Sequence, residues 1–189
     1  MRFEKLEPHK IFSTFKDELD LEIGFGRSVF LRKYAEDNPQ RFVVGVEVRK
    51  KAVEEMQGII QAQKLENVHL VHGNGYLCLN DMFQDKSLDK IFIFHPDPWI
   101  KTRHLKRRLI NDEFLLLAQK KLKKDGRIYL STDAEFLWKE IIKTFDANGG
   151  FRQLQDSDFW QNYYSGRWDD ISKEKGRKTF FATFSLNKD

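Results

Sequence analysis

Leu19-Asp-Leu-Glu-Ile-Gly-Phe-Gly26 is the stretch of sequence that decides the fold. It is a short apolar run that ends in two glycines, and this combination is typical of a buried β-strand that leads into a tight turn. The run predicts a first strand at 19–24. Similar short apolar runs predict further strands at 42–47, 68–72, 90–95 and 127–131.

Longer segments with apolar residues at three- and four-residue spacing lie between these runs and predict helices at 30–36, 50–64, 105–123 and 134–147. Strands that alternate with helices are typical of an α/β fold, in which an open, mostly parallel sheet carries helices on both faces. Lys123-Lys-Asp-Gly126 is interpreted as a helix stop. Near the carboxyl terminus, 149–154 and 178–186 are expected to pair at an edge of the sheet.

The composition is that of a folded protein, with 40% hydrophobic, 14% aromatic and 33% charged residues, which excludes a disordered chain. A length of 189 residues suits a single domain at 1–189. No apolar run is long enough to span a membrane and the first residues include acids, so we expect a cytoplasmic protein. Cys78 is the only cysteine and is expected in the core. His69 and His72 would face opposite sides of a strand, so no metal site is expected.

Polar residues follow the first strands of the predicted sheet and suggest a cofactor site. Gly24 and Gly26 allow close approach to a ligand, but Val29 stands where a dinucleotide fingerprint has its third glycine. Glu22 would repel a pyrophosphate and attract an ammonium group. Glu47 is placed to accept hydrogen bonds from ribose, and Asn74 to pair with a purine edge. Together they indicate S-adenosylmethionine, whereas the glycine pair alone would indicate an ordinary turn.

A candidate substrate site follows the fourth predicted strand, at His95-Pro-Asp-Pro-Trp99. Two prolines stiffen the backbone on both sides of Asp97, so its carboxylate is presented from a fixed loop. Asp97 is interpreted as an acceptor for the donor edge of a base, with Trp99 packing nearby. The alternative is that Pro-Asp-Pro is only a turn.

Residues 101–108, Lys-Thr-Arg-His-Leu-Lys-Arg-Arg, carry five fixed positive charges in a chain whose net charge is only +4. Beside a candidate active site, such a run favours binding of nucleic-acid phosphates. A solvated helix start is the alternative. Asp133, after the fifth strand, is expected either to face the same cleft or to cap the next helix.

These motifs together resemble the bacterial tRNA (guanine-N7)-methyltransferases over about 19–150. The resemblance rests on Glu-Ile-Gly-Phe-Gly at 22–26, Gly-Val-Glu at 45–47, Pro-Asp-Pro-Trp-x-Lys-x-Arg-His-x-Lys-Arg-Arg at 96–108 and Thr-Asp at 132–133. It implies a class I S-adenosylmethionine-dependent methyltransferase with a Rossmann-like fold, acting on tRNA, in which the variable loop is the expected target.

The resemblance also implies roles for individual residues. Glu22, Glu47, Asn74 and Asp97 would contact S-adenosylmethionine, with Asp97 also the catalytic residue. Lys101 and Asp133 would contact the substrate. The RNA would be touched by the basic run, at Arg103, His104, Lys106, Arg107 and Arg108.

The carboxyl-terminal part departs from the family pattern, because the usual Thr-x-Phe/Tyr-Glu is absent. The closest counterpart is Gly166-Arg-Trp-Asp169, which predicts a substrate contact at Asp169; a different register would use Glu174.

The chemistry of this reaction requires positioning rather than proton removal. N7 of guanine has a lone pair at neutral pH, so Asp97 would act by orienting the base and by stabilising positive charge. No Gly-x-Ser-x-Gly elbow or Walker loop is present. Two alternatives stay open: a non-catalytic RNA-binding protein on the same scaffold, and a methyltransferase that acts on an exocyclic base amine. The sequence does not indicate an oligomeric state.

Overall fold

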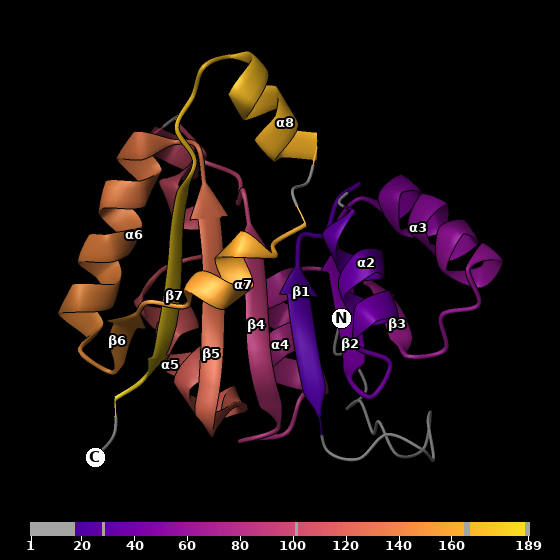
Figure 1. Ribbon diagram of the computed structural model, residues 1–189. Helices are drawn as coiled ribbons and strands as arrows, with labels where there is room; N and C mark the ends of the chain where they lie inside the picture. Colours follow the sequence, from indigo (N-terminus) through magenta and orange to yellow (C-terminus); the bar gives the residue numbers. More distant parts are fainter. Residues whose placement is uncertain (1–17, 28, 101, 165–166, 188–189) are drawn as a thin grey trace.

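The computed structural model describes residues 18–27, 29–100, 102–164 and 167–187. Its strands form one seven-stranded sheet in the order β3-β2-β1-β4-β5-β7-β6 (Figure 1). Neighbouring strands from β3 to β5 are parallel, whereas β7 is antiparallel to both β5 and β6. The predicted α/β fold with a mostly parallel sheet is confirmed. No described helix is long and apolar enough to cross a membrane.

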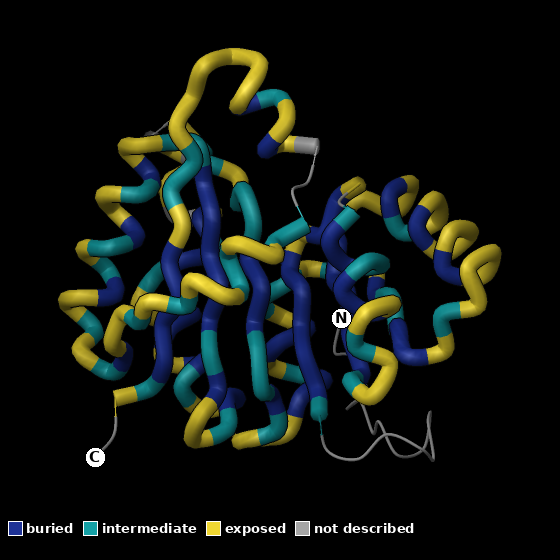
Figure 2. The backbone as a smooth tube through the Cα atoms, viewed as in Figure 1, coloured by how far each residue is buried: buried dark blue, intermediate teal, exposed yellow. Residues whose placement is uncertain are grey.

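Each predicted strand is present, although the fifth begins at Leu122, five residues before its predicted start at 127. The bounds of the strands are β1 Leu19–Ile23, β2 Phe42–Glu47, β3 Val68–His72, β4 Leu88–Phe94, β5 Leu122–Thr132, β6 Phe151–Leu154 and β7 Phe180–Leu186. Every residue of β1 and β2 is buried, as expected for parallel strands that are covered on both faces. Figure 2 shows this buried centre, with the exposed residues gathered on the outer helices and loops.

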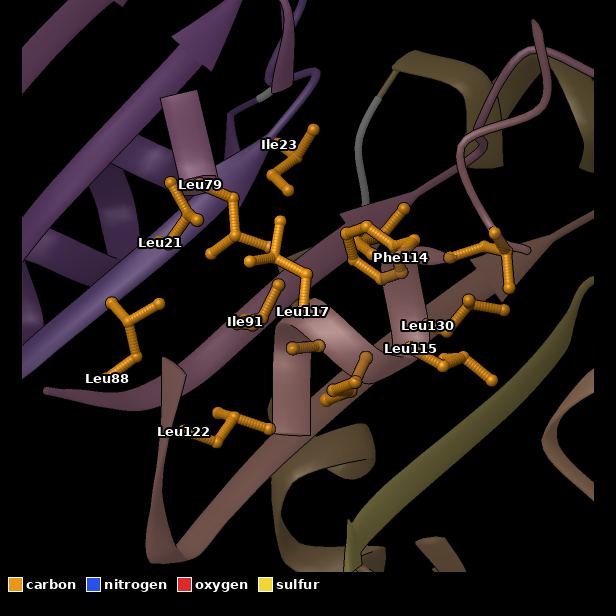
Figure 3. Close-up of a cluster of buried hydrophobic side chains, with 14 of the residues drawn as sticks. Leu21, Ile23, Leu79, Leu88, Ile91, Phe114, Leu115, Leu117, Leu122 and Leu130 are labelled. Atoms are coloured by element: carbon orange, nitrogen blue, oxygen red, sulfur yellow. The ribbon is translucent and has the colours of Figure 1, made fainter. Parts of the chain in front are cut away.

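Helices cover both faces of the sheet. One face carries α2 Phe30–Asp37, α3 Lys50–Ala62 and the short α7 Ser157–Gln161, and the other carries α4 Gly75–Met82, α5 Asp112–Lys121 and α6 Glu135–Asn148. In β4, for example, Ile91 and Ile93 pack in one core and Phe92 packs in the other. Figure 3 shows Leu21 and Ile23 of β1 in one buried cluster with Leu79 of α4 and Phe114 of α5. The last helix, α8 Arg167–Glu174, lies above the ends of the strands.

The helix predicted at 105–123 is wrong in its first half. The basic run forms a 3₁₀ helix, η1 Thr102–Arg107, and the α-helix begins only at Asp112, where the side chain of Asn111 accepts a hydrogen bond from the amide of Phe114 at 2.9 Å. The helix stop predicted at 123–126 is also wrong. Helix α5 ends at Lys121, and these residues form an irregular part of β5, between Leu122, which pairs with Leu88, and Arg127, which pairs with Lys90.

Candidate active site at the carboxyl edge of the sheet

The loops that follow β1 to β5 meet at one edge of the sheet, here called the carboxyl edge (Figure 1). Strand order reverses between β1 and β4, and open α/β sheets bind ligands in the crevice expected at such a reversal, beyond the carboxyl ends of the strands. Glu22 lies on the β1 side of this crevice and Asp97 on the β4 side. The structure therefore brings together the two regions that the sequence singled out.

Glu22 is a buried acid with an unsatisfied oxygen. Its residue is 1% exposed, and its Oε2 has no hydrogen-bond partner among the described residues. Burial raises the pKa of the carboxyl to about 8, and the neighbouring charge of Glu47 adds to the increase. A buried carboxylate without a partner costs free energy unless a ligand supplies donors or positive charge.

The glycine turn after β1 is hydrogen-bonded to the side chain of Glu47. Gly24 and Gly26 have φ of +80° and +56°, a left-handed conformation that favours glycine. The Gly26 amide donates to Glu47 Oε2 at 2.9 Å, and the Arg49 amide donates to Oε1 at 2.8 Å. A Cβ on Gly26 would lie 2.9 Å from Arg49 Nη2. The carboxylate of Glu47 is thus buried and is oriented by the amides of the glycine turn and of Arg49.

The predicted purine contact lies on the loop after β3. Asn74 is exposed, and its Oδ1 accepts a hydrogen bond from the amide of Leu77 at 3.1 Å, which caps α4. The exposed apolar side chains of Val48 and Leu77 follow Glu47 and Asn74. Neither residue was predicted from the sequence, although an apolar residue directly after a strand-end acid is a signal that could have found Val48.

These residues fit S-adenosylmethionine. Glu22 offers an orphaned buried oxygen to an ammonium group, Glu47 offers an oriented carboxylate to ribose hydroxyls, and Gly24 of the glycine turn is exposed. Val48 and Leu77 supply apolar surface for a flat ring. Pyrophosphate would instead meet the negative field of the two acids.

The loop that carries Asp97 is held in a strained conformation. His95 and Trp99 have φ of +47° and +40°, which is unusual for residues other than glycine. The His95 amide donates to the carbonyl of Ser131 at 2.8 Å, and Arg108 Nε donates to the carbonyl of Pro98 at 2.9 Å. Asp97 itself is exposed at the tip of this braced loop, within electrostatic reach of Arg49.

The described arginines of the basic run differ in burial and in their contacts. Arg108 is 8% exposed, and its guanidinium binds Glu140 as well as the Pro98 carbonyl. These contacts brace the Asp97 loop, and the RNA contact of Arg108 stays a prediction. Arg103 and Arg107 are exposed, and Arg107 lies 5.3 Å from the centre of the Trp99 ring. Lys101 and the side chains of His104 and Lys106 lie outside the described part of the chain.

Two further predicted residues, Asp133 and Asp169, meet around His95. Asp133 accepts hydrogen bonds from Ser172 Oγ at 2.8 Å and Arg177 Nη1 at 3.0 Å. Burial alone would raise the pKa of Asp133, but these bonds outweigh burial and lower it. Asp169 is 3% exposed and bonds to His95 Nε2 at 2.9 Å. The alternative residue Glu174 is exposed at the end of α8.

The fold and the site define a class of protein, the class I S-adenosylmethionine-dependent methyltransferases. Among solved structures, the chain resembles the 16S rRNA methyltransferase KamB, with a TM-score of 0.68 and 12% identity over all of both chains. It also resembles an antibiotic-related methyltransferase, with a TM-score of 0.65 and 20% identity over 94% of this chain and 92% of that one. At these identities the similarity establishes the fold.

The chain belongs to the family described as "Putative methyltransferase", whose model matches residues 16–180. A relative from Nitrosococcus oceani named tRNA (guanine-N(7)-)-methyltransferase is 37% identical over 71% of this chain and 57% of its own length. Relatives with the same name from Marinobacter nauticus and Buchnera aphidicola are 33% and 32% identical over 87% and 97% of this chain, and 67% and 80% of their own. The predicted family resemblance is confirmed, although the chain spans little more than half of the first relative.

Proposed function

We propose that this protein transfers a methyl group from S-adenosylmethionine to N7 of a guanosine in tRNA. Two observations support the proposal. Relatives with this activity in their names match most of the chain, and Glu22, whose buried Oε2 has no partner among the described residues, and the exposed Asp97 follow the neighbouring strands β1 and β4. The tRNA variable loop is the proposed target, and the cytoplasm is the proposed location of the protein.

The chain's own acids would hold the cofactor, which supplies a methyl group on a positively charged sulfur. Glu22 would accept the ammonium group, Glu47 the ribose hydroxyls and Asn74 the purine edge. Gly24 and Gly26 would admit the amino-acid part of the cofactor close to the backbone. These contacts leave the β4 side of the crevice to the substrate.

Asp97 is the proposed catalytic residue. Its carboxylate would accept hydrogen bonds from the donor edge of guanine and would face the methyl donor from the tip of the braced loop. As N7 gains positive charge, the negative carboxylate stabilises that charge. No residue has to remove a proton from N7 before attack, so orientation is the main contribution of the protein.

The RNA would approach along the carboxyl edge beyond Asp97. Arg103 and Arg107 would contact phosphates, together with His104 and Lys106 of the same run. Lys101, Asp133 and Asp169 are proposed to contact the substrate nucleotide. Phosphate contacts position the RNA, whereas acidic side chains recognise the donor groups of a base.

The test is incubation with labelled S-adenosylmethionine and bulk tRNA, followed by digestion and mass spectrometry of the nucleosides. We expect 7-methylguanosine. Asp97→Asn keeps the size of the side chain and removes its charge, so turnover at saturating tRNA should fall at least about tenfold, or roughly 1.4 kcal/mol of barrier.

Two outcomes would contradict the proposal. A base methylated on an exocyclic amine would identify the protein as the other kind of methyltransferase. Binding of tRNA without any methylation, by a protein that does not bind the cofactor, would identify an RNA-binding protein on a methyltransferase scaffold.

A further inference from the structure

Helix α8 is attached to the rest of the protein by a polar face. Asp169 and Ser172 are 3% and 0% exposed, whereas Trp168 on the same helix is 56% exposed. The spacing of three residues puts the two buried residues on one side of the helix. Surface helices usually bury an apolar stripe, so the docking of α8 depends on specific polar contacts. Figures 1 and 2 show this helix above the carboxyl edge, with most of its length exposed.

His95 is the partner of that polar face. Its side chain is 6% exposed and directly follows β4, and its Nε2 lies 2.9 Å from Asp169 Oδ1. On the other side of the ring, Nδ1 lies 3.6 Å from Asp133 Oδ1 and has no hydrogen-bond partner among the described residues. One imidazole therefore stands between a carboxylate from the end of the parallel sheet and a carboxylate from α8.

Neighbouring side chains donate hydrogen bonds to both carboxylates beside His95. The hydroxyl of Tyr163 donates to Asp169 Oδ2 at 3.1 Å, while Ser172 and Arg177 donate to Asp133. An ionised carboxylate only accepts hydrogen bonds, so Nε2 of His95 must be the donor to Asp169. A side chain without a donor at that point would leave the buried Asp169 short of a partner, which favours release of α8 into water.

We propose that His95 is a positioning residue, which docks α8 onto the carboxyl edge through the hydrogen bond between its Nε2 and Asp169. His95 is also two residues from Asp97, and its strained backbone begins the loop that carries the catalytic acid. One side chain thus sets both the position of Asp169 and the base of the Asp97 loop. The proposal rests on the proposed function, in which both acids contact the substrate.

The first test is hydrogen exchange of α8 in the cofactor-free protein. His95→Asn is the main variant, because asparagine accepts a positive φ but its shorter side chain does not reach Asp169. Exchange at 167–174 should become at least about tenfold faster, as expected when a helix undocks locally. Exchange at 75–82 in α4 is the internal reference and should not change.

Asp169→Ala and Asp170→Ala form a matched pair on the same helix. Asp169 is buried against His95, whereas Asp170 is exposed, so only the first substitution should accelerate exchange in α8. His95→Gln places an amide donor about as far out as Nε2 and should restore at least half of the lost protection.

Unchanged α8 exchange in both His95→Asn and Asp169→Ala would overturn the proposal. So would equal acceleration in α8 and α4, since that pattern indicates loss of global stability. Affinity for S-adenosylmethionine, measured without tRNA, should stay within about twofold of wild type, while kcat/KM for tRNA falls about tenfold. The exchange readout needs no substrate, so a failure to form 7-methylguanosine would refute the proposed function without deciding the role of His95.

Discussion

Two buried carboxyl groups on β1 differ in their hydrogen-bond partners. Asp20 and Glu22 lie on the same face of the strand, and both are almost completely buried. Asp20 receives hydrogen bonds from Arg41 Nη2 at 2.7 Å and from the Tyr34 hydroxyl at 2.8 Å. Glu22 lacks such partners on its Oε2 among the described residues. We interpret the first as part of the fold and the second as a group that is kept for a ligand.

The raised pKa of Glu22 gives a prediction about stability. The carboxyl ionises near 4.5 in an unfolded chain and near 8 in the folded one. Between these values unfolding releases a proton, so the stability of the wild type falls as pH rises, by up to about 1.4 kcal/mol per pH unit. Glu22→Gln removes this loss, and its melting temperature should rise relative to wild type from pH 5 to pH 8.

Thermal denaturation at four pH values measures the effect. S-adenosylmethionine should stabilise the wild type at pH 8 and fail to stabilise Glu22→Gln, because the amide does not attract an ammonium group. Parallel melting curves for the two proteins at every pH would show that Glu22 is not buried as an isolated acid.

Among the elements, most strands were predictable because each is a short apolar run, but the polar start of β5 at Leu122 was not, because it depends on neighbouring β4 rather than on an apolar pattern. Helix α4 was missed, since it begins at a glycine and depends on the cap from Asn74. Helix α8 was missed because its buried face is polar and its partner, His95, is 74 residues away from Asp169. The false helix start at 105 has a similar cause: Arg108 is drawn inward by Pro98 and Glu140.

The same division applies to the site. Residues at strand ends, such as Glu22, Glu47 and Asp97, were predictable because a parallel sheet gathers its strand ends at one edge. The bracing role of Arg108 and the hydrogen bond between His95 and Asp169 depend on side chains that meet only in the folded chain, so local spacing gave no sign of them.

The packing of α2 on β2 gives a prediction at the scale of elements. Gly45 lies in the middle of β2, and a Cβ there would lie 2.7 Å from Leu31 Cδ2 and 2.9 Å from Phe25 Cδ1. Gly45→Ala should therefore destabilise the protein by about 1–3 kcal/mol through overpacking. Gly45 also pairs with Glu22, so cofactor binding should weaken.

Gly58 supplies the matched control. It lies inside α3, and a Cβ there would meet nothing within 4 Å in the described chain. Gly58→Ala should stabilise the protein by about 0.5–1 kcal/mol, because alanine favours the helix. Urea denaturation compares the two variants, and equal effects on the midpoint would refute the packing argument.

At the scale of the whole molecule, the strand order separates the proposed cofactor residues from the proposed substrate residues. The reversal between β1 and β4 puts Glu22 and Glu47 on one side of the crevice and Asp97, Asp133 and Asp169 on the other. The net charge of +4 is small, so recognition of a polyanion has to come from the placement of cations rather than from their number. Arg103 and Arg107 stand on the carboxyl edge, whereas Lys120 and Lys124 stand at the opposite edge, where α5 ends and β5 begins.

This placement predicts that equal changes of net charge have unequal effects on tRNA binding. Replacing both Arg103 and Arg107 with alanine should weaken binding and make the dependence of log affinity on log salt shallower by about one unit for each lost phosphate contact. Replacing Lys120 and Lys124 with alanine removes the same charge and should leave the slope unchanged. Turnover of the arginine variant should be near normal once tRNA is saturating, because Asp97 and the cofactor contacts are intact. Salt titrations of binding beside a steady-state series separate the cases: an equal loss of slope in both pairs would mean that tRNA senses only the overall charge, and an unchanged slope in the arginine pair would mean that η1 is a solvated surface.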